Sequence, residues 1–127
     1  MHPEILIVDD NPVNLRLASD VLQDAGYRVM CVTCASAVIA ALDARMPNLL
    51  LVDIGLPGTD GLTLTRVLRR DPRYIDLRIV ALTAFAMKGD RQKALDAGCD
   101  GYISKPINTR EFAAQVKGYL DASPGQL

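Results

Sequence analysis

The chain has 127 residues, half of them hydrophobic, and this length suits a single domain with its own core. Its 14 basic and 15 acidic residues leave a net charge of −1. This balance argues against nucleic acid as the main partner, because such binding needs a basic surface. No apolar run approaches the roughly 20 residues of a membrane helix, and no secretory leader is visible. We therefore expect a cytoplasmic protein without a membrane partner.

Strand and helix patterns alternate from one end of the chain to the other. The apolar run Glu4–Val8 predicts the first strand, after which Asn11 offers a helix N-cap and Pro12 suits the first helical position. Gly26 is placed to end this first helix. Further along the chain the pattern predicts, in order, a strand at Tyr27–Val32, a helix at Ala35–Ala44, a strand at Leu49–Val52, a helix at Leu62–Arg70, a strand at Arg78–Leu82, a helix at Met87–Ala97, a strand at Gly101–Ser104 and a helix around Phe112 to Leu120.

This alternation predicts an α/β fold, because successive parallel strands need helical crossovers between them. About five βα units suit a flavodoxin-like, doubly wound (βα)5 fold. Its five-stranded parallel sheet has the order 2-1-3-4-5, with helices on both faces. We expect one domain over residues 1–127, with its core at about 4–120 and a frayed tail at 121–127.

Polar residues follow four of the five predicted strands. Asp9 and Asp10 follow the first strand, Asp53 the third, Thr83 the fourth and Lys105 the fifth. In the predicted strand order, the carboxyl ends of these four strands surround the point where ligands bind. Three carboxylates with one ammonium group suit a metal ion together with a phosphoryl group.

The chemistry of such a site centres on Asp53, which stands alone at the tip of the central strand. A carboxylate can accept a phosphoryl group and form an acyl phosphate. Thr83 and Lys105 would donate hydrogen bonds to the transferring oxygens. We expect Mg²⁺, or Mn²⁺ in its place, to be held by Asp10 and Asp53, by Asp9 through water, and by the backbone carbonyl of Gly55.

Four motifs, in order and on predicted strand ends, together resemble the receiver domain of response regulators (CheY-like) from about Ile5 to Leu120. They are Ile7-Val8-Asp9-Asp10-Asn11, Val52-Asp53-Ile54-Gly55-Leu56-Pro57-Gly58-Thr59-Asp60-Gly61, Ala81-Leu82-Thr83-Ala84 and Ser104-Lys105-Pro106. The segments 81–90 and 97–107 are similar to stand-alone, single-domain regulators of the DivK type and to receivers attached to hybrid histidine kinases. A role in the cell cycle rests only on the DivK-type similarity.

The resemblance implies a signalling domain of a two-component phosphorelay. It implies that Asp53 is the phosphoacceptor, that the donor is a histidine kinase or a histidine phosphotransfer protein, and that Thr83 is the switch hydroxyl. It also implies an aromatic switch at Tyr102 and a cis peptide before Pro106. The signal would then reach a downstream protein through the face made by the fourth helix, the fifth strand and the fifth helix, with contacts at Phe85, Met87, Lys93 and Tyr102. We expect a signalling domain rather than an enzyme. Its chemistry would be limited to assisting its own phosphorylation and slow self-dephosphorylation.

Other interpretations stay open beside this one. A Mg²⁺-dependent aspartate phosphatase resembling the haloacid dehalogenases would carry an acid at the position of Gly55, and the chain has no cap domain. A pseudo-receiver, an interaction module that no longer accepts phosphate, is disfavoured because the acids, Thr83 and Lys105 are all present. The chain could still be the receiver module of a hybrid kinase or of a multidomain effector. Gly55 and Phe85 depart from the common family pattern, which leaves the lifetime of the acyl phosphate open.

The cysteines raise one further alternative, because Cys31 and Cys34 spell a CxxC pair. Redox sites of this kind place the second cysteine in the first turn of a helix, close to the first. Here Cys31 falls late in a predicted strand, and Cys99 makes the cysteine count odd. Free thiols in a reducing compartment are therefore favoured over a redox pair.

Overall fold

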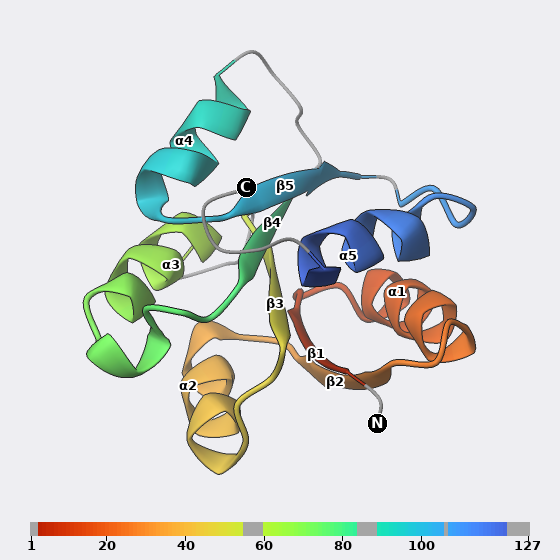
Figure 1. Ribbon diagram of the computed structural model, residues 1–127, viewed down its shortest axis with the longest axis horizontal. Coiled ribbons are helices and arrows are strands. Elements are labelled where there is room, and N and C mark those ends of the chain that lie inside the picture. Colours follow the sequence, from red (N-terminus) through yellow and green to blue (C-terminus); the bar gives the residue numbers. More distant parts are fainter. Residues whose placement is uncertain (1–2, 55–59, 84–88, 106, 122–127) are drawn as a thin grey trace.

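The computed structural model describes residues 3–54, 60–83, 89–105 and 107–121 (Figure 1). Its strands form one parallel sheet in the order β2-β1-β3-β4-β5, which confirms the predicted flavodoxin-like arrangement. The strands are β1 (Glu4–Val8), β2 (Arg28–Val32), β3 (Leu49–Asp53), β4 (Ile79–Thr83) and β5 (Gly101–Ser104).

Helices cover both faces of the sheet, as Figure 1 shows. One face carries α1 (Pro12–Asp24) and α5 (Phe112–Asp121). The other carries α2 (Ala35–Ala44), α3 (Gly61–Arg69) and α4 (Asp90–Ala97), together with a short 3₁₀ helix, η1 (Pro72–Tyr74), that the sequence pattern did not predict. The sheet therefore lies between two helical layers, with a hydrophobic core on each side.

Strand β1 shows how one sequence supplies both cores. Ile5 and Ile7 pack on the α1 and α5 side, whereas Leu6 and Val8 pack on the side of α2 and α3, because successive side chains of a strand point to opposite faces. All four are almost completely buried. Burying one such aliphatic side chain contributes about 1.5–3 kcal/mol. An apolar strand without alternating polar residues is thus what a sheet covered on both faces requires.

Several element boundaries differ from the predicted ones by a residue or two, and side-chain capping explains the start of α3. The Asp60 carboxylate accepts a hydrogen bond from the Thr63 backbone N–H at 2.8 Å, which fixes Asp60 as the N-cap. Strand β2 begins after Tyr27, because the Tyr27 N–H is already bonded to the Leu22 carbonyl at 3.1 Å. Helix α4 is described from Asp90, and the predicted start at Met87 lies outside the described residues.

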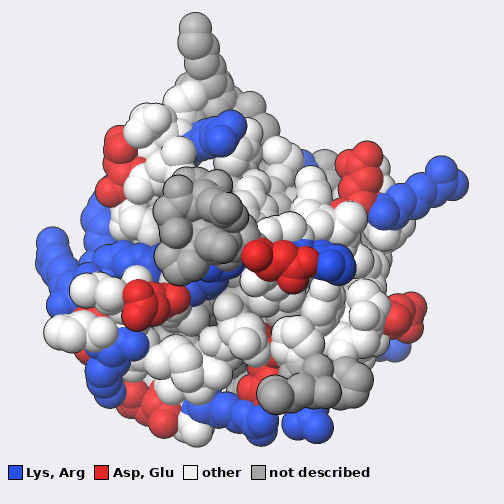
Figure 2. Space-filling view, viewed as in Figure 1, with Lys and Arg blue, Asp and Glu red and all other residues white. Residues whose placement is uncertain are grey.

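Charged side chains of both signs are mixed over the face drawn in Figure 2. This mixture agrees with the nearly balanced composition of 14 basic and 15 acidic residues. Within the described ranges, no helix has the length and apolar character needed to cross a membrane.

Candidate functional site

The carboxyl ends of β1 and β3 bring three acidic side chains together. Carboxylate oxygens of Asp9, Asp10 and Asp53 all lie within 4.8 Å of one another. Asp9 and Asp53 are buried, with 2% and 7% of their surface exposed, while Asp10 is exposed to solvent. Negative charge held this close, and partly out of water, needs a cation to compensate it.

Lys105, directly after β5, supplies one such cation within the described part of the chain. Its Nζ donates to Asp9 Oδ2 at 2.6 Å and lies 3.3 Å from Asp53 Oδ2. The ammonium group, which follows β5, therefore bridges Asp9 at the end of β1 and Asp53 at the end of β3. Sequence reasoning placed Lys105 near this cluster but did not predict its pairing with Asp9.

Asp9 is held from both sides by the protein itself. Its Oδ1 accepts from the Asn11 backbone N–H at 2.9 Å, and its Oδ2 carries the bond to Lys105. The Asn11 side chain in turn accepts from the first backbone N–H groups of α1, as the predicted N-cap. Both carboxylate oxygens of Asp9 therefore have a partner within the protein, and its role toward a metal ion stays a prediction.

Backbone contacts fix the position of Asp53 at the end of β3. The Ile54 N–H donates to the Leu82 carbonyl at 3.0 Å, and the Gly61 N–H donates to the Ile54 carbonyl at 3.2 Å. A Cβ atom at Gly61 would lie only 2.4 Å from the Asp53 carbonyl oxygen. Only glycine therefore lets the first turn of α3 pack directly against the strand end that carries Asp53.

Thr83 occupies the last position of β4, in register with Ser104 of β5. It is buried, and its carbonyl accepts from the Lys105 N–H at 2.7 Å, which ties the β4 and β5 ends together.

The hard carboxylate oxygens of Asp9, Asp10 and Asp53 fit Mg²⁺, which prefers oxygen ligands and keeps several waters.

The other predicted site residues fall into two groups. Gly55, Phe85, Met87 and Pro106 lie outside the described residues, so their predicted roles stay predictions. Tyr102 is half-buried in β5, and Lys93 is exposed on α4. Neither residue is part of the acidic cluster.

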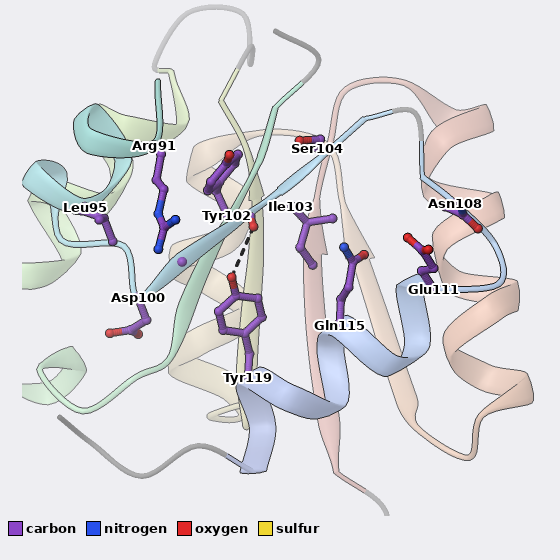
Figure 3. A pocket seen from close by; sticks show the side chains of 11 residues that line it. Arg91, Leu95, Asp100, Tyr102, Ile103, Ser104, Asn108, Glu111, Gln115 and Tyr119 are labelled. Carbon is purple, nitrogen blue, oxygen red and sulfur yellow. Dashed lines mark hydrogen bonds between the residues drawn. The ribbon is translucent and has the colours of Figure 1, made fainter. Parts of the chain in front are cut away.

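A groove of about 730 Å³ lies where the resemblance predicts the output face (Figure 3). Strand β5 contributes Tyr102, and α4 contributes Arg91 and Leu95 rather than Lys93. The Tyr119 hydroxyl of α5 donates to the Tyr102 carbonyl at 3.3 Å. The groove therefore joins three elements, and the full set of its lining residues is Arg91, Leu95, Asp100, Gly101, Tyr102, Ile103, Ser104, Asn108, Glu111, Gln115 and Tyr119.

The three cysteines are free thiols. Cys31 lies in β2 and Cys34 is the N-cap of α2, an extended residue rather than a member of the first helical turn. A hydrogen bond with the Ser36 hydroxyl, at 3.3 Å from the sulfur, lowers the pKa of Cys34. Burial raises the pKa of Cys99. This arrangement agrees with the expected free thiols.

Comparison with known proteins identifies the family. The family model of the response regulator receiver domain matches residues 5–117 of this sequence. The polar-differentiation response regulator DivK of Brucella ovis is 36% identical over 120 residues, which cover 94% of this chain and 98% of that protein.

Solved structures agree with this match. A CheY-like response regulator receiver domain protein from Methanospirillum hungatei has a TM-score of 0.85 at 30% identity, with 95% of each chain covered. The chemotaxis response regulator CheY4 of Vibrio cholerae has a TM-score of 0.88 at 23% identity, covers 94% of this chain and 99% of its own, and shows the fold. The chain belongs to the response regulator receiver domain family.

Proposed function

We propose that this chain is a stand-alone response regulator that accepts a phosphoryl group on Asp53 from a phosphohistidine of a partner kinase or phosphotransfer protein. The observation that carries the proposal is the cluster of three carboxylates joined by Lys105 at the ends of β1, β3 and β5. The family match supports the same chemistry.

In the proposed transfer, a carboxylate oxygen of Asp53 attacks phosphorus while the bond between phosphorus and the donor imidazole nitrogen breaks. The electron pair of that bond stays with the imidazole, and an acyl phosphate forms on Asp53. The Lys105 ammonium, 3.3 Å from Asp53 Oδ2, reduces the repulsion between the carboxylate and the incoming anion. Thr83, at the neighbouring strand end, would donate its hydroxyl to a phosphoryl oxygen.

Asp10, Asp53 and the Gly55 carbonyl would hold Mg²⁺, with Asp9 reaching it through water. When bound, the ion neutralises charge on the transferring oxygens. The chain itself contributes the placement of the acids. Asp9 is fixed by Asn11 and Lys105, and Asp53 by the packing of Gly61 on its backbone. A preformed acidic site of this kind lowers the reorganisation needed for transfer.

Phosphorylation would be read by a downstream protein at the groove between α4, β5 and α5. The groove supports this proposal because Tyr102, the proposed aromatic switch residue, lies in it and pairs with Ala81, two strand positions before Thr83 at the end of β4. We place the protein in the cytoplasm, as a single domain over the whole chain, with no enzymatic turnover of other substrates.

The test is intact mass after incubation with acetyl phosphate and Mg²⁺. We expect one phosphoryl adduct on the wild-type chain, none in Asp53→Asn, and none when EDTA removes the metal. Asp20→Asn is the matched control, since Asp20 is exposed on α1. An adduct that persists in Asp53→Asn would place the phosphoacceptor elsewhere, and no adduct on a Mg²⁺-bound wild-type chain would favour a pseudo-receiver.

A further inference from the structure

The first residue of α3, Gly61, touches the backbone of the proposed phosphoacceptor. Its N–H donates to the Ile54 carbonyl at 3.2 Å, and a Cβ atom at this position would lie 2.4 Å from the Asp53 carbonyl oxygen. The same atom would lie 2.6 Å from Val52 Cγ1. The start of α3 and the end of β3 are therefore closely packed, so a small displacement of this helix changes the surroundings of Asp53.

Thr65, one turn further along α3, carries a hydroxyl group that the protein encloses completely. Its Oγ1 donates to the Gly61 carbonyl at 2.8 Å and lies 3.7 Å from Cys99 Sγ. A buried hydroxyl is costly unless it is hydrogen-bonded, and threonine is a weaker helix former than alanine or leucine. Since Thr65 is 0% exposed, its place in the middle of α3 depends on these two contacts.

The single hydrogen of the Thr65 hydroxyl fixes the direction of both contacts. That hydrogen is directed to the Gly61 carbonyl, so the Cys99 S–H is the donor to Thr65 Oγ1. Burial raises the pKa of Cys99, and the thiol therefore keeps its proton at neutral pH. Thr65 thus connects Cys99, between α4 and β5, with the turn of α3 that contacts Asp53.

The segment that contains Cys99 is bonded to α3 at a second point. Arg69 follows Thr65 by four residues, on the same side of the helix, and its Nε donates to the Gly98 carbonyl at 2.9 Å. Its Nη2 lies 3.1 Å from Asp100 Oδ2. Two successive turns of α3 therefore bond to residues 98–100, where this helix lies beside α4 (Figure 1).

We propose that Thr65 is a positioning residue for Asp53. Through the Gly61 carbonyl, its hydroxyl holds the first turn of α3 against the end of β3, and this fixes the direction in which the Asp53 carboxylate meets the phosphoryl group. The inference rests on the proposed function. A misplacement of about 1 Å at a reacting group can lower a rate by about 100-fold, so a shift of about 0.3–0.4 Å corresponds to about five-fold.

Thr65→Val removes the hydroxyl and keeps the shape of the side chain. Thr63→Val is the matched control, since Thr63 is exposed on the same helix, and Thr65→Ser keeps the hydroxyl. In EDTA, we expect amide hydrogen exchange of the Gly61 N–H to rise about five-fold or more in Thr65→Val, and to stay within about two-fold of wild type in the other two variants. Equal exchange in all three would overturn the proposal, because the first turn of α3 would not depend on the hydroxyl.

The rate of phosphorylation tests the effect on Asp53 itself. With acetyl phosphate at saturating Mg²⁺, an Asp53 oxygen attacks phosphorus, the bond from phosphorus to the acetyl oxygen breaks, and acetate leaves with the electron pair. By intact mass, we expect this rate to be about five-fold lower in Thr65→Val and within about two-fold of wild type in Thr65→Ser and Thr63→Val. A wild-type rate in Thr65→Val, or an equally low rate in Thr65→Ser, would overturn the inference.

Gly61→Ala gives a second test if Thr65→Val does not fold, because the added Cβ displaces the same turn directly. We expect a rate about five-fold or more below wild type at saturating Mg²⁺, and a wild-type rate would overturn the proposal. The mass measurement separates the two levels of the argument. A wild-type chain that takes no phosphoryl adduct refutes the proposed function, whereas a labelled wild type with an unaffected Thr65→Val refutes only the role of Thr65.

Discussion

Replacing Lys105 with methionine removes the ammonium group from the acidic cluster and keeps most of the side-chain volume. In the wild-type chain this ammonium lies 2.6 Å from Asp9 and 3.3 Å from Asp53, with its side chain 11% exposed. Breaking a buried ion pair costs about 3–5 kcal/mol, because the remaining charge stays buried without compensation. Since part of Lys105 reaches solvent, we expect Lys105→Met to lose about 3 kcal/mol of its free energy of unfolding, the lower end of that range. The total stability of a domain is about 5–15 kcal/mol.

Urea denaturation in EDTA measures this loss of free energy of unfolding. A loss of about 3 kcal/mol corresponds to a fall of about 10 °C in Tm for a domain of this size. Lys117→Met is the control, because the Lys117 and Asp121 side chains are 67% and 63% exposed and form a pair within one helix turn. Such an exposed pair contributes no more than about 0.5 kcal/mol.

Adding Mg²⁺ should reverse the difference in part. A ligand at about 100 times its Kd stabilises the folded state by about 2.7 kcal/mol. We expect Lys105→Met to gain at least about 1 kcal/mol more than the wild type, because the ion supplies the positive charge that the variant lacks. Equal midpoints for the two lysine variants in EDTA, or a larger Mg²⁺ effect on the wild type, would refute this account of the site.

Three further predictions concern the surroundings of the site. Gly61→Ala should lower the free energy of unfolding by about 2 kcal/mol or more and weaken Mg²⁺ binding, because the added Cβ would lie 2.4 Å from the Asp53 carbonyl oxygen. Urea denaturation and calorimetry measure the two effects, and unchanged values would contradict this packing. Asp60→Ala should cost about 1 kcal/mol in the same denaturation assay through loss of the α3 N-cap. Iodoacetamide at neutral pH should label Cys34 before Cys99 by mass mapping, because the lowered pKa of Cys34 gives more thiolate and the raised pKa of buried Cys99 gives less.

The strand ends could be predicted from the sequence because local and long-range signals agree there. Apolar runs that end in Asp9 or Asp53 mark buried parallel strands, and a parallel sheet brings their carboxyl ends to one edge. The N-cap role of Asn11 is equally local, since it depends on the backbone of the next turn only. These features need no knowledge of how distant side chains meet.

Contacts between distant segments could not be predicted in the same way. Arg69 falls in a run of charged residues that suits a solvated helix end, yet it bonds to Gly98 and Asp100, about thirty residues further along the chain. Nothing local distinguishes Arg69 from its neighbour Arg70, which is exposed. Only the packing of α3 against the end of α4 decides which of the two arginines is enclosed.

The same distinction separates the acidic cluster of this domain from the packing around it. The acidic cluster is built on strand ends whose positions follow from the sheet, so a receiver site can be recognised from four short motifs. The packing of α3 against α4 depends instead on contacts between distant segments, such as those of Arg69 with the Gly98 carbonyl and with Asp100.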